Sequence, residues 1–289
     1  MSEKFVKLKH TDLNPYKLAE MLEALENTVE LHSISVRYKG ESVLEGAWAP
    51  FSLDEPQMMH SLSKSGTSIC DSGCSYTLSR IVSKVMGENC LAVMQKRVFD
   101  KMDLGKINWL TSPEGHNTGG WGMYLTARQI SALAQLLIQK GNWNGEQLVP
   151  AEWVEEMGKQ RVVIPGDEKK ALTHYAYHIK AGKEIFAAEG AFGQYLICFR
   201  DLPVAVGITS GAREYLAADI CLKYMKEAVT VPCPEEKRAE GQKYLEAKIN
   251  SLSLPQPEGR FRTPKKATEK LFNREMVFTE NPRKIERAK

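Results

Sequence analysis

Several features that would mark a membrane or secreted protein are missing from this sequence of 289 residues. The opening stretch, MSEKFVKLKHTDLNPYK, contains no apolar segment of the kind that forms the centre of a secretory signal. No apolar run approaches the roughly 20 residues that a membrane-spanning helix requires. We therefore expect a soluble, cytoplasmic protein with no membrane partner.

The sequence also lacks a recognisable metal site. Its six cysteines are scattered, and in a chain without a signal we expect them to be reduced thiols. Cys70 and Cys74 stand four apart, but no second Cys/His pair has the spacing that would complete a zinc site. His174 and His178 are also four apart, yet the alternation HYAYHI favours a strand with both histidines on one exposed face. We predict no metal and no cofactor.

Charge is nearly balanced, with a formal net charge of +3, which is too small to indicate a nucleic-acid partner by itself. The basic charge is concentrated at the end, because residues 256–289 hold ten Lys/Arg against five Asp/Glu. Such a tail could bind nucleic acid or acidic lipid. A solvated, partly disordered segment is the favoured reading, so no nucleic acid is expected. We predict a charged, proline-containing C-terminal extension over 231–289.

The remainder has enough apolar material, 43% of all residues, to build a sizeable core. Asn14 and Pro15 predict a helix start, and apolar residues then recur at helical spacing. A hairpin follows over 31–48, then helical patterns between 76 and 160, three strand-like runs up to about 211, and a last helix over 213–227. This order predicts one α/β (α+β) domain over 14–230, with an antiparallel sheet flanked by helices.

Ser61 and Lys64 carry the clearest chemistry. They form the only Ser-x-x-Lys in the chain, within MHSLSKS. Residues three apart on a helix share a face, so the two side chains can meet. A serine hydroxyl becomes a nucleophile when a neighbour removes its proton, and a lysine can do so if burial lowers its pKa. This spacing is a known signature of β-lactamases and penicillin-binding proteins.

Longer stretches extend this pattern, and they occur in order: LEGAWAPF, MHSLSKS, the block from GGWGMYLTARQ to GNWNGEQLVPAEWVEE, and EGAFGQYLICF. Together they resemble the β-lactamase-related serine hydrolases, close to class C β-lactamases, penicillin-binding proteins and D-stereospecific esterases and peptidases. The resemblance runs from about Leu18 to Met225. It implies a β-lactamase/transpeptidase-like fold, with Ser61 as the nucleophile and Lys64 as the group that activates it.

The resemblance also implies an oxyanion hole at the EGAFGQ stretch. There a backbone N–H near Phe192, together with that of Ser61, would hold the developing negative charge. Gly190, Ala191 and Gly193 belong to the same stretch, where missing side chains would let a substrate approach the backbone. Members of the family commonly begin this motif with Lys or His, whereas this chain has Glu189.

A larger departure is found after Lys64. The resemblance implies a long helical stretch there, followed by a Tyr and an Asn that pass a proton to the leaving group. Here Cys70, Asp71 and Ser72 stand where Tyr-Asn-Ser is expected, only about five residues after Lys64. We predict a chain shortened between about 69 and 71, with a reduced all-helical region and a degenerate second motif. Neither Cys70, which is short, nor Tyr76, six residues later, is a convincing substitute.

Two functions stay open at this point. One is a serine hydrolase acting on a small ester or amide, such as a β-lactam-like substrate, through an acyl-enzyme on Ser61. The other is a catalytically impaired or inactive member of the family that keeps the scaffold as a binding protein. The shortening would also uncover apolar surface, so we expect either a repacked helical region or self-association.

Overall fold

The computed structural model describes residues 5–6, 10–63, 72–212, 215–255, 276–277 and 287–288. The chain divides into two compact units, Met1–Leu254 and Pro255–Lys289. In the second unit the described residues form one antiparallel pair, β15 (Met276–Val277) with β16 (Arg287–Ala288). The first unit holds the sheet, the helices and Ser61, and it extends beyond the boundary at 230 that the sequence suggested.

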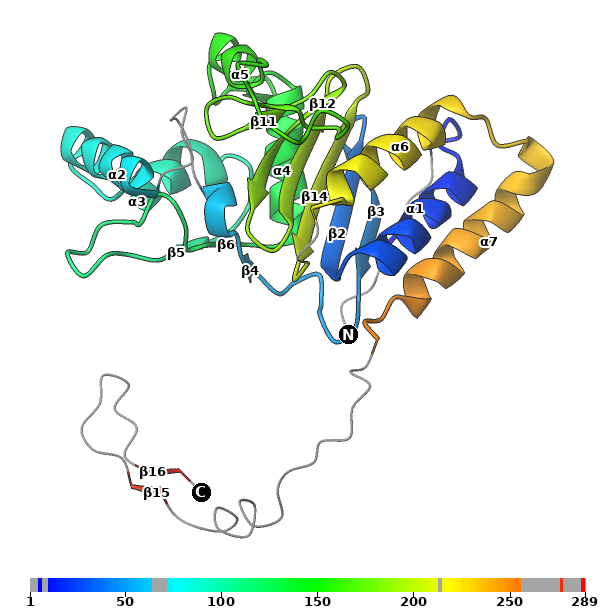
Figure 1. The fold of residues 1–289 in the computed structure, drawn as a ribbon, viewed down its shortest axis with the longest axis horizontal. Helices are drawn as coiled ribbons and strands as arrows, with labels where there is room; N and C mark the ends of the chain where they lie inside the picture. The colour runs from blue at the N-terminus through cyan, green and yellow to red at the C-terminus, as the bar shows by residue number, and fades with distance from the viewer. Residues whose placement is uncertain are drawn as a thin grey trace. The chain divides into compact units, whose positions relative to one another are not determined.

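An antiparallel sheet forms the centre of the first unit (Figure 1). In the described part of the chain it has nine strands in the order β1-β3-β2-β14-β13-β12-β11-β10-β9. Their bounds are β1 (Phe5–Val6), β2 (Leu31–Tyr38), β3 (Glu41–Ala47), β9 (Val162–Val163), β10 (His174–Tyr175), β11 (Lys180–Ala181), β12 (Ile185–Gly190), β13 (Gln194–Phe199) and β14 (Val204–Ser210). Strands from early and late in the sequence meet where β2 pairs with β14, with Val36 opposite Val206. The expected antiparallel sheet is confirmed.

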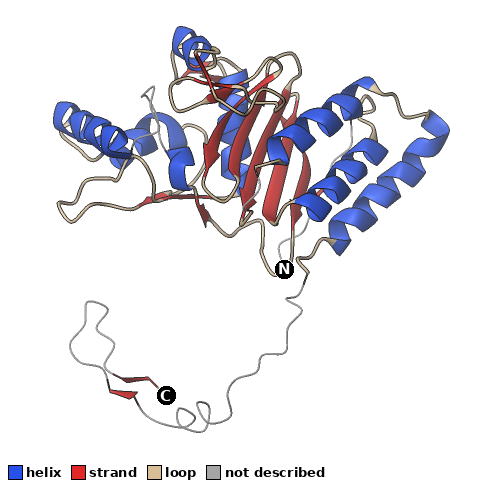
Figure 2. Cartoon of the chain, viewed as in Figure 1, coloured by secondary structure: helices blue, strands red, loops and turns tan. Residues whose placement is uncertain are grey.

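Helices cover both faces of this sheet (Figure 2). On one face lie three helices, α1 (Pro15–Thr28), α6 (Ala217–Thr230) and α7 (Glu235–Ser251). On the other lies α4 (Ala127–Ile138). Because side chains alternate along a strand, β13 supplies both cores: Tyr195 and Ile197 face the first, Leu196 and Cys198 the second. The sheet is therefore buried on both faces.

Helix α1 begins as the sequence predicts. The Asn14 side chain accepts hydrogen bonds from the backbone N–H groups of Tyr16 and Lys17, and Pro15 takes the first helical position, where it has no N–H to leave unpaired. The buried face of α1 carries the expected apolar side chains: Leu18, Met21, Leu22 and Leu25. This face fixes α1 against the sheet and against its two helical neighbours.

Helix α7 belongs to the folded unit, although its amino-acid composition led us to place it in the C-terminal extension. Its sequence is rich in charge, yet Leu245 and Ile249 are fully buried in the core beside α1. A charged pair reinforces the contact, because Lys248 Nζ lies 2.5 Å from a Glu26 carboxylate oxygen. These apolar side chains dock a largely charged helix on α1, and the compact unit continues to Leu254.

The remaining elements lie between β3 and β12. They are β4 (Gln57–Met58), the 3₁₀ turn η1 (His60–Ser63), α2 (Ser72–Met86), α3 (Cys90–Met94) with the π-helical turn η2 (Gln95–Phe99), β5 (Asn108–Trp109), β6 (Met123–Leu125), the hairpin β7 (Asn142–Trp143) and β8 (Glu146–Gln147), and α5 (Ala151–Met157). Strands β4, β6 and β5 form a small sheet of their own.

Among the described residues, no helix has the length and apolar character needed to cross a bilayer.

The run HYAYHI differs from its prediction. Instead of one strand with two exposed histidines, β10 and β11 form two short antiparallel strands joined by a tight turn, with His174 opposite Ala181. His178 lies in this turn with φ +57° and is only 6% exposed. The left-handed backbone at His178 breaks the alternation, so the expected exposed face was wrong.

Candidate active site

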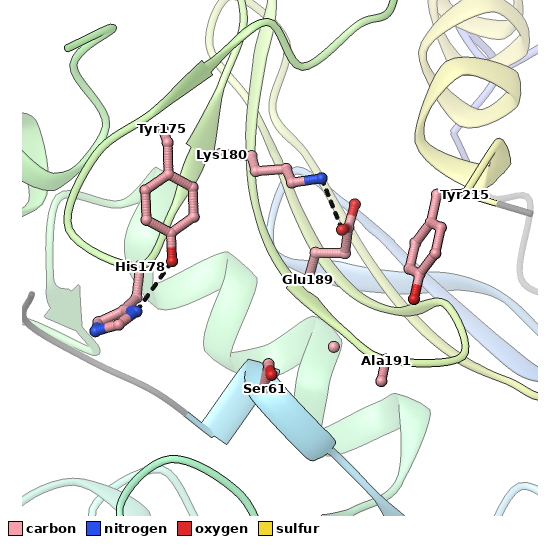
Figure 3. A pocket seen from close by; sticks show the side chains of 8 residues that line it. Ser61, Tyr175, His178, Lys180, Glu189, Ala191 and Tyr215 are labelled. Carbon is pink, nitrogen blue, oxygen red and sulfur yellow. Dashed lines mark hydrogen bonds and ion pairs between the residues drawn. The ribbon is translucent and has the colours of Figure 1, made fainter. Parts of the chain in front are cut away.

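Ser61 lies in a cavity of about 210 Å³ at the edge of the large sheet. The cavity is lined by Ser61, Tyr175, His178, Lys180, Glu189, Gly190, Ala191 and Tyr215 (Figure 3). A larger cavity, about 390 Å³, lies beside α2. Its serine, Ser83, donates a 2.9 Å hydrogen bond to the Ser79 carbonyl within the helix and is thereby occupied. The smaller cavity is the candidate site because it joins a potential nucleophile to several titratable groups.

Ser61 is held in place by apolar neighbours on either side in the sequence. The 3₁₀ turn η1 carries it, and the Leu62 N–H closes that turn on the Met59 carbonyl at 3.0 Å. Met59 is fully buried, Leu62 nearly so, and both belong to the core on the α4 face. The Met59 N–H also donates to the Met123 carbonyl at 2.8 Å. Ser61 itself is half-buried, between anchored residues.

Strand β12 approaches η1 closely at Gly190. A Cβ atom added to Gly190 would lie 2.2 Å from the Met59 carbonyl oxygen, which is far inside van der Waals contact. The sequence suggested that this glycine makes room for a substrate backbone. The structure shows that it makes room for the protein's own backbone, and that Gly190 thereby places β12 against the Ser61 turn.

The hairpin between β12 and β13 turns at Phe192 and Gly193. Both have left-handed backbones, with φ +63° and +76°, and the Gly193 N–H donates to the Gly190 carbonyl at 3.2 Å. The half-exposed Phe192 ring meets the His60 ring edge-on, with 5.1 Å between the ring centres. Burial lowers the pKa of His60 below its ordinary value, so this imidazole is neutral at pH 7.

The backbone offers donors on both sides of the cavity. Within the described residues, neither the N–H of Ser61 nor that of Phe192 donates to a backbone carbonyl. The Ser61 N–H lies in the first turn of η1, where N–H groups have no partner inside the helix. Gly190 and Ala191, which directly precede Phe192 in the sequence, line the cavity together with Ser61.

A charged pair lies on the wall opposite Ser61 (Figure 3). Lys180 Nζ is 2.7 Å from one Glu189 carboxylate oxygen, and the Tyr195 hydroxyl donates to the other at 2.9 Å. Burial, followed by the Glu189 carboxylate, raises the pKa of Tyr195, so its hydroxyl keeps its proton and remains a donor. The Glu189 carboxylate is therefore held between a cation from β11 and a hydroxyl from β13.

A second polar pair comes from the β10–β11 turn. The Tyr175 hydroxyl and His178 Nδ1 are 3.0 Å apart, and their rings lie edge-on. Tyr215 completes the lining from the segment before α6 and is 37% exposed. The sequence analysis predicted an exposed strand position for His178 and did not single out Tyr175, Lys180 or Tyr215. These residues are far from Ser61 in the sequence, and only the tertiary fold brings them to the same cavity.

The structure describes only some of the residues that the sequence analysis assigned to the activating lysine and the second motif. Lys64, Cys70 and Asp71 lie outside the described residues. Ser72 begins α2, is exposed, and lies beside Gly120 rather than in the lining of the cavity. The Tyr76 hydroxyl lies 3.0 Å from both the Ser112 hydroxyl and the Glu114 carboxylate, so it can donate its one proton to the carboxylate and accept from the serine. In this arrangement Tyr76 contacts Ser112 and Glu114 and does not line the cavity at Ser61.

The described residues contain no group of three or more His, Cys, Asp or Glu side chains arranged to hold a metal ion. The titratable groups of the cavity are instead paired with one another, Lys180 with Glu189 and Tyr175 with His178. Acid–base and nucleophilic chemistry are what this arrangement can perform.

Comparison with known proteins shows a shared fold at low sequence similarity. No family model and no curated protein sequence matches the chain. A Bacteroides dorei protein assigned as a β-lactamase has a TM-score of 0.60 and 11% identity, covering 75% of this chain and 99% of its own. A Bacillus anthracis protein assigned as a 6-aminohexanoate-dimer hydrolase has a TM-score of 0.58 and 14% identity, covering 81% and 83%.

A third solved structure, EstCE1, is described as a hydrolase with promiscuous acyltransferase activity. It has a TM-score of 0.57 and 9% identity, and the match covers 74% of this chain and 99% of EstCE1. The chain has a β-lactamase/transpeptidase-like fold. At these sequence identities the similarity shows a shared fold, and the chemistry of this chain depends on its own residues.

Proposed function

We propose that this protein is a serine hydrolase that cleaves a small ester or amide through an acyl-enzyme on Ser61. One observation carries the proposal: Ser61 lines a cavity whose opposite side is built from β12, and Gly190 permits the close approach of that strand. The hydrolase names of several proteins with this fold support the same reaction class.

In the proposed reaction, Ser61 Oγ attacks the acyl carbon while Lys64, outside the described residues, accepts the hydroxyl proton. The backbone N–H groups of Ser61 and of the Phe192 turn hold the oxyanion. Among the described residues neither N–H donates to a backbone carbonyl, which supports this role, since donors aimed at an oxyanion must not be occupied elsewhere. One such donor contributes about 3 kcal/mol to the transition state.

Active-site labelling tests the proposal. Wild type and Ser61→Ala are treated with a fluorophosphonate probe and, separately, with a chromogenic cephalosporin. We expect a covalent adduct on wild type that is absent from Ser61→Ala. Ser251→Ala is a matched control, because Ser251 is an exposed serine at the end of α7 whose hydroxyl donates to the Lys248 carbonyl at 2.9 Å. An intact, cooperatively melting wild type without a Ser61-dependent adduct would refute the hydrolase proposal.

A non-catalytic binding protein is the second candidate. It is favoured by α2, where Ser72 is exposed and Tyr76 is engaged with Ser112 and Glu114, so the described part of that helix supplies no acid to the cavity. This alternative predicts that the cephalosporin raises the melting temperature of wild type and of Ser61→Ala equally, without an adduct on either.

A further inference from the structure

We propose that His60 and Phe192 form a binding subsite for an aromatic group of the substrate, beside the serine that the proposed reaction uses. The inference rests on the proposed function and deepens it, because it names a class of substrate: small esters or amides that carry an aromatic ring close to the acyl carbon. We call these two side chains the aromatic subsite.

The aromatic subsite borders the cavity at Ser61. His60 directly precedes Ser61 in the sequence, and Phe192 directly follows Ala191. Ser61 and Ala191 both line the cavity (Figure 3). The cavity measures about 210 Å³, whereas sites for small molecules commonly measure ~300–1,000 Å³. A substrate held at Ser61 therefore extends past the cavity, and the aromatic subsite is neighbouring surface that it can contact.

The two rings form an apolar surface that the protein covers only in part. Their centres are 5.1 Å apart and their planes meet at 64°, a geometry typical of packed aromatic pairs. Phe192 is 50% exposed, so a large part of its ring can contact a ligand. Burial lowers the pKa of His60, and the surface is therefore uncharged at pH 7. A third ring, from the substrate, would pack well against it.

The backbone at both residues is the second argument. The angle φ is +46° at His60 and +63° at Phe192, in the left-handed region that Gly, Asn and Asp enter at lower cost. A bulky side chain is uncommon there, and Phe192 leaves half of its surface exposed, so burial in the core does not offset the cost. Residues kept in such conformations concentrate at functional sites.

The turn that carries Phe192 is held in place by the buried side chain of Gln194. The amide nitrogen of this side chain lies 3.4 Å from the carbonyl oxygens of Ala191 and Phe192, and its amide oxygen accepts from the Ser210 N–H at 3.2 Å. A Cβ atom added to Gly193 would lie 3.1 Å from Ser210 Oγ, so the turn packs tightly on the end of β14. The Phe192 ring is thus pre-organised, which reduces the entropy lost on binding.

Tyr215 is another exposed aromatic side chain at the cavity. It is less exposed than Phe192, and Lys180 Nζ lies 6.0 Å from the centre of its ring. An ammonium group beside this ring makes its surroundings polar, so we assign the aromatic group of the substrate to His60 and Phe192. Tyr215 is the alternative that the experiment has to separate from them.

Two sulfonyl fluorides test the aromatic subsite. With both, the Ser61 oxygen displaces fluoride from sulfur, but phenylmethanesulfonyl fluoride carries a ring that methanesulfonyl fluoride lacks. Mass spectrometry gives the rate of Ser61 modification by each reagent. The readout is the ratio of the two rates, because a change in Ser61 reactivity that is common to both reagents cancels.

In Phe192→Asn the ratio, phenyl over methyl, should fall about tenfold or more relative to wild type. Asn tolerates the left-handed backbone and keeps the N–H of this position, so the variant removes only the ring. Phe192→Tyr keeps a ring and should stay within about threefold of the wild-type ratio. His60→Asn should lower the ratio less than Phe192→Asn, and an unchanged ratio there would overturn the assignment of His60.

Trp153→Ala is the matched control. Trp153 is also a partly exposed aromatic residue, and its ring centre lies 5.1 Å from that of Tyr177, but it does not line the cavity. This variant should keep the wild-type ratio. An unchanged ratio in Phe192→Asn would overturn the aromatic subsite. A fall in Tyr215→Ala that equals or exceeds the fall in Phe192→Asn would overturn it as well.

Two pairs of esters identify the part of the substrate that carries the ring. p-Nitrophenyl phenylacetate and p-nitrophenyl acetate differ by a ring on the acyl side, whereas benzyl acetate and ethyl acetate differ by a ring on the leaving group. In one pair, Phe192→Asn should lower kcat/KM for the ring-bearing ester about tenfold more than for its partner. Equal changes within both pairs would overturn the inference.

The same labelling data separate this inference from the proposed function. Wild type that forms no Ser61 adduct with either sulfonyl fluoride or with the fluorophosphonate would overturn the hydrolase proposal, and the aromatic subsite with it. Ser61 adducts whose rate ratio is the same in wild type and in Phe192→Asn would overturn the aromatic subsite alone.

Discussion

The large sheet and helix α2 are built in opposite ways. On the sheet side, every residue of β13 and β14 is buried. On the helical side, the buried residues of α2 are three serines spaced four apart, Ser75, Ser79 and Ser83. The apolar side chains Ile81 and Val85 of α2 are 51% and 76% exposed. One region is held by apolar burial, the other in large part by polar contacts.

This difference indicates which region contributes more to the stability of the fold. The sheet places Gly190 and Ala191 beside Ser61 through a core that is closed on both faces. Helix α2 is held instead by contacts such as the 2.8 Å hydrogen bond from the Ser79 hydroxyl to the Asn117 carbonyl. A single hydrogen bond of this kind contributes about 1 kcal/mol, less than a buried aliphatic side chain. We infer that the sheet fixes the candidate site and that α2 is the weaker partner.

The largest effect expected from this contrast comes from a matched pair of isoleucine substitutions. Ile197→Ala in β13 removes a fully buried side chain and should cost about 2–5 kcal/mol in the free energy of unfolding. Ile81→Ala in α2 removes a half-exposed one and should change that free energy by no more than about 0.5 kcal/mol. Urea unfolding followed by circular dichroism measures both. Comparable losses from the two variants would show that α2 is packed as firmly as the sheet.

A smaller effect on stability, with a marked effect on reactivity, is expected from Gly190→Ala. The new Cβ would collide with the Met59 carbonyl and push η1 away from β12, at a cost of about 1–3 kcal/mol. Fluorophosphonate labelling of Ser61 should slow while the circular dichroism spectrum is kept. Gly158→Ala is the control, since its Cβ would have ordinary contacts, the nearest at 3.5 Å. Unchanged labelling in Gly190→Ala would mean that the spacing of η1 and β12 does not govern the site.

The smallest effect on the folded monomer concerns the exposed face of α2. We propose that Ile81 and Val85 mediate self-association at high protein concentration, because they form apolar surface that the described residues leave uncovered. Val85→Glu should shift sedimentation velocity profiles toward the monomer and leave the urea midpoint unchanged. Lys84→Gln, on the same exposed turn, makes the same change of one negative unit in net charge and controls for charge alone. A wild type that is monomeric at every concentration would contradict self-association.

Local sequence patterns predicted most of the framework of helices and strands. Asn14 and Pro15 mark the start of α1, and the hairpin of β2 and β3 follows from alternation and turn residues. Gly141, with φ +79°, follows α4 and ends it, because its N–H donates back to the Leu136 carbonyl. These features depend on neighbours in the sequence, and the sequence is therefore sufficient to find them.

Most of the site could not be found that way. Lys180 and Glu189 come together because β11 pairs with β12 in one register, which places Lys180 opposite Ala187. Tyr175 and His178 reach the cavity only after the backbone of the turn adopts a left-handed conformation that no alternation pattern reports. Helix α7 was assigned to the extension because charge dominates its composition, although Leu245 and Ile249 are buried in the core.

The pairing of β2 with β14 has a consequence for synthesis of the chain. Ser33 and Thr209, whose hydroxyls meet at 2.6 Å across these strands, are 176 positions apart in the sequence. As the chain leaves the ribosome, the hairpin of β2 and β3 is complete long before β14 exists, and one edge of β2 has no partner during that interval. An open strand edge invites pairing with other chains. Yield of folded protein should therefore depend on how fast the ribosome delivers the stretch up to Ser210, and on chaperones that shield the early hairpin.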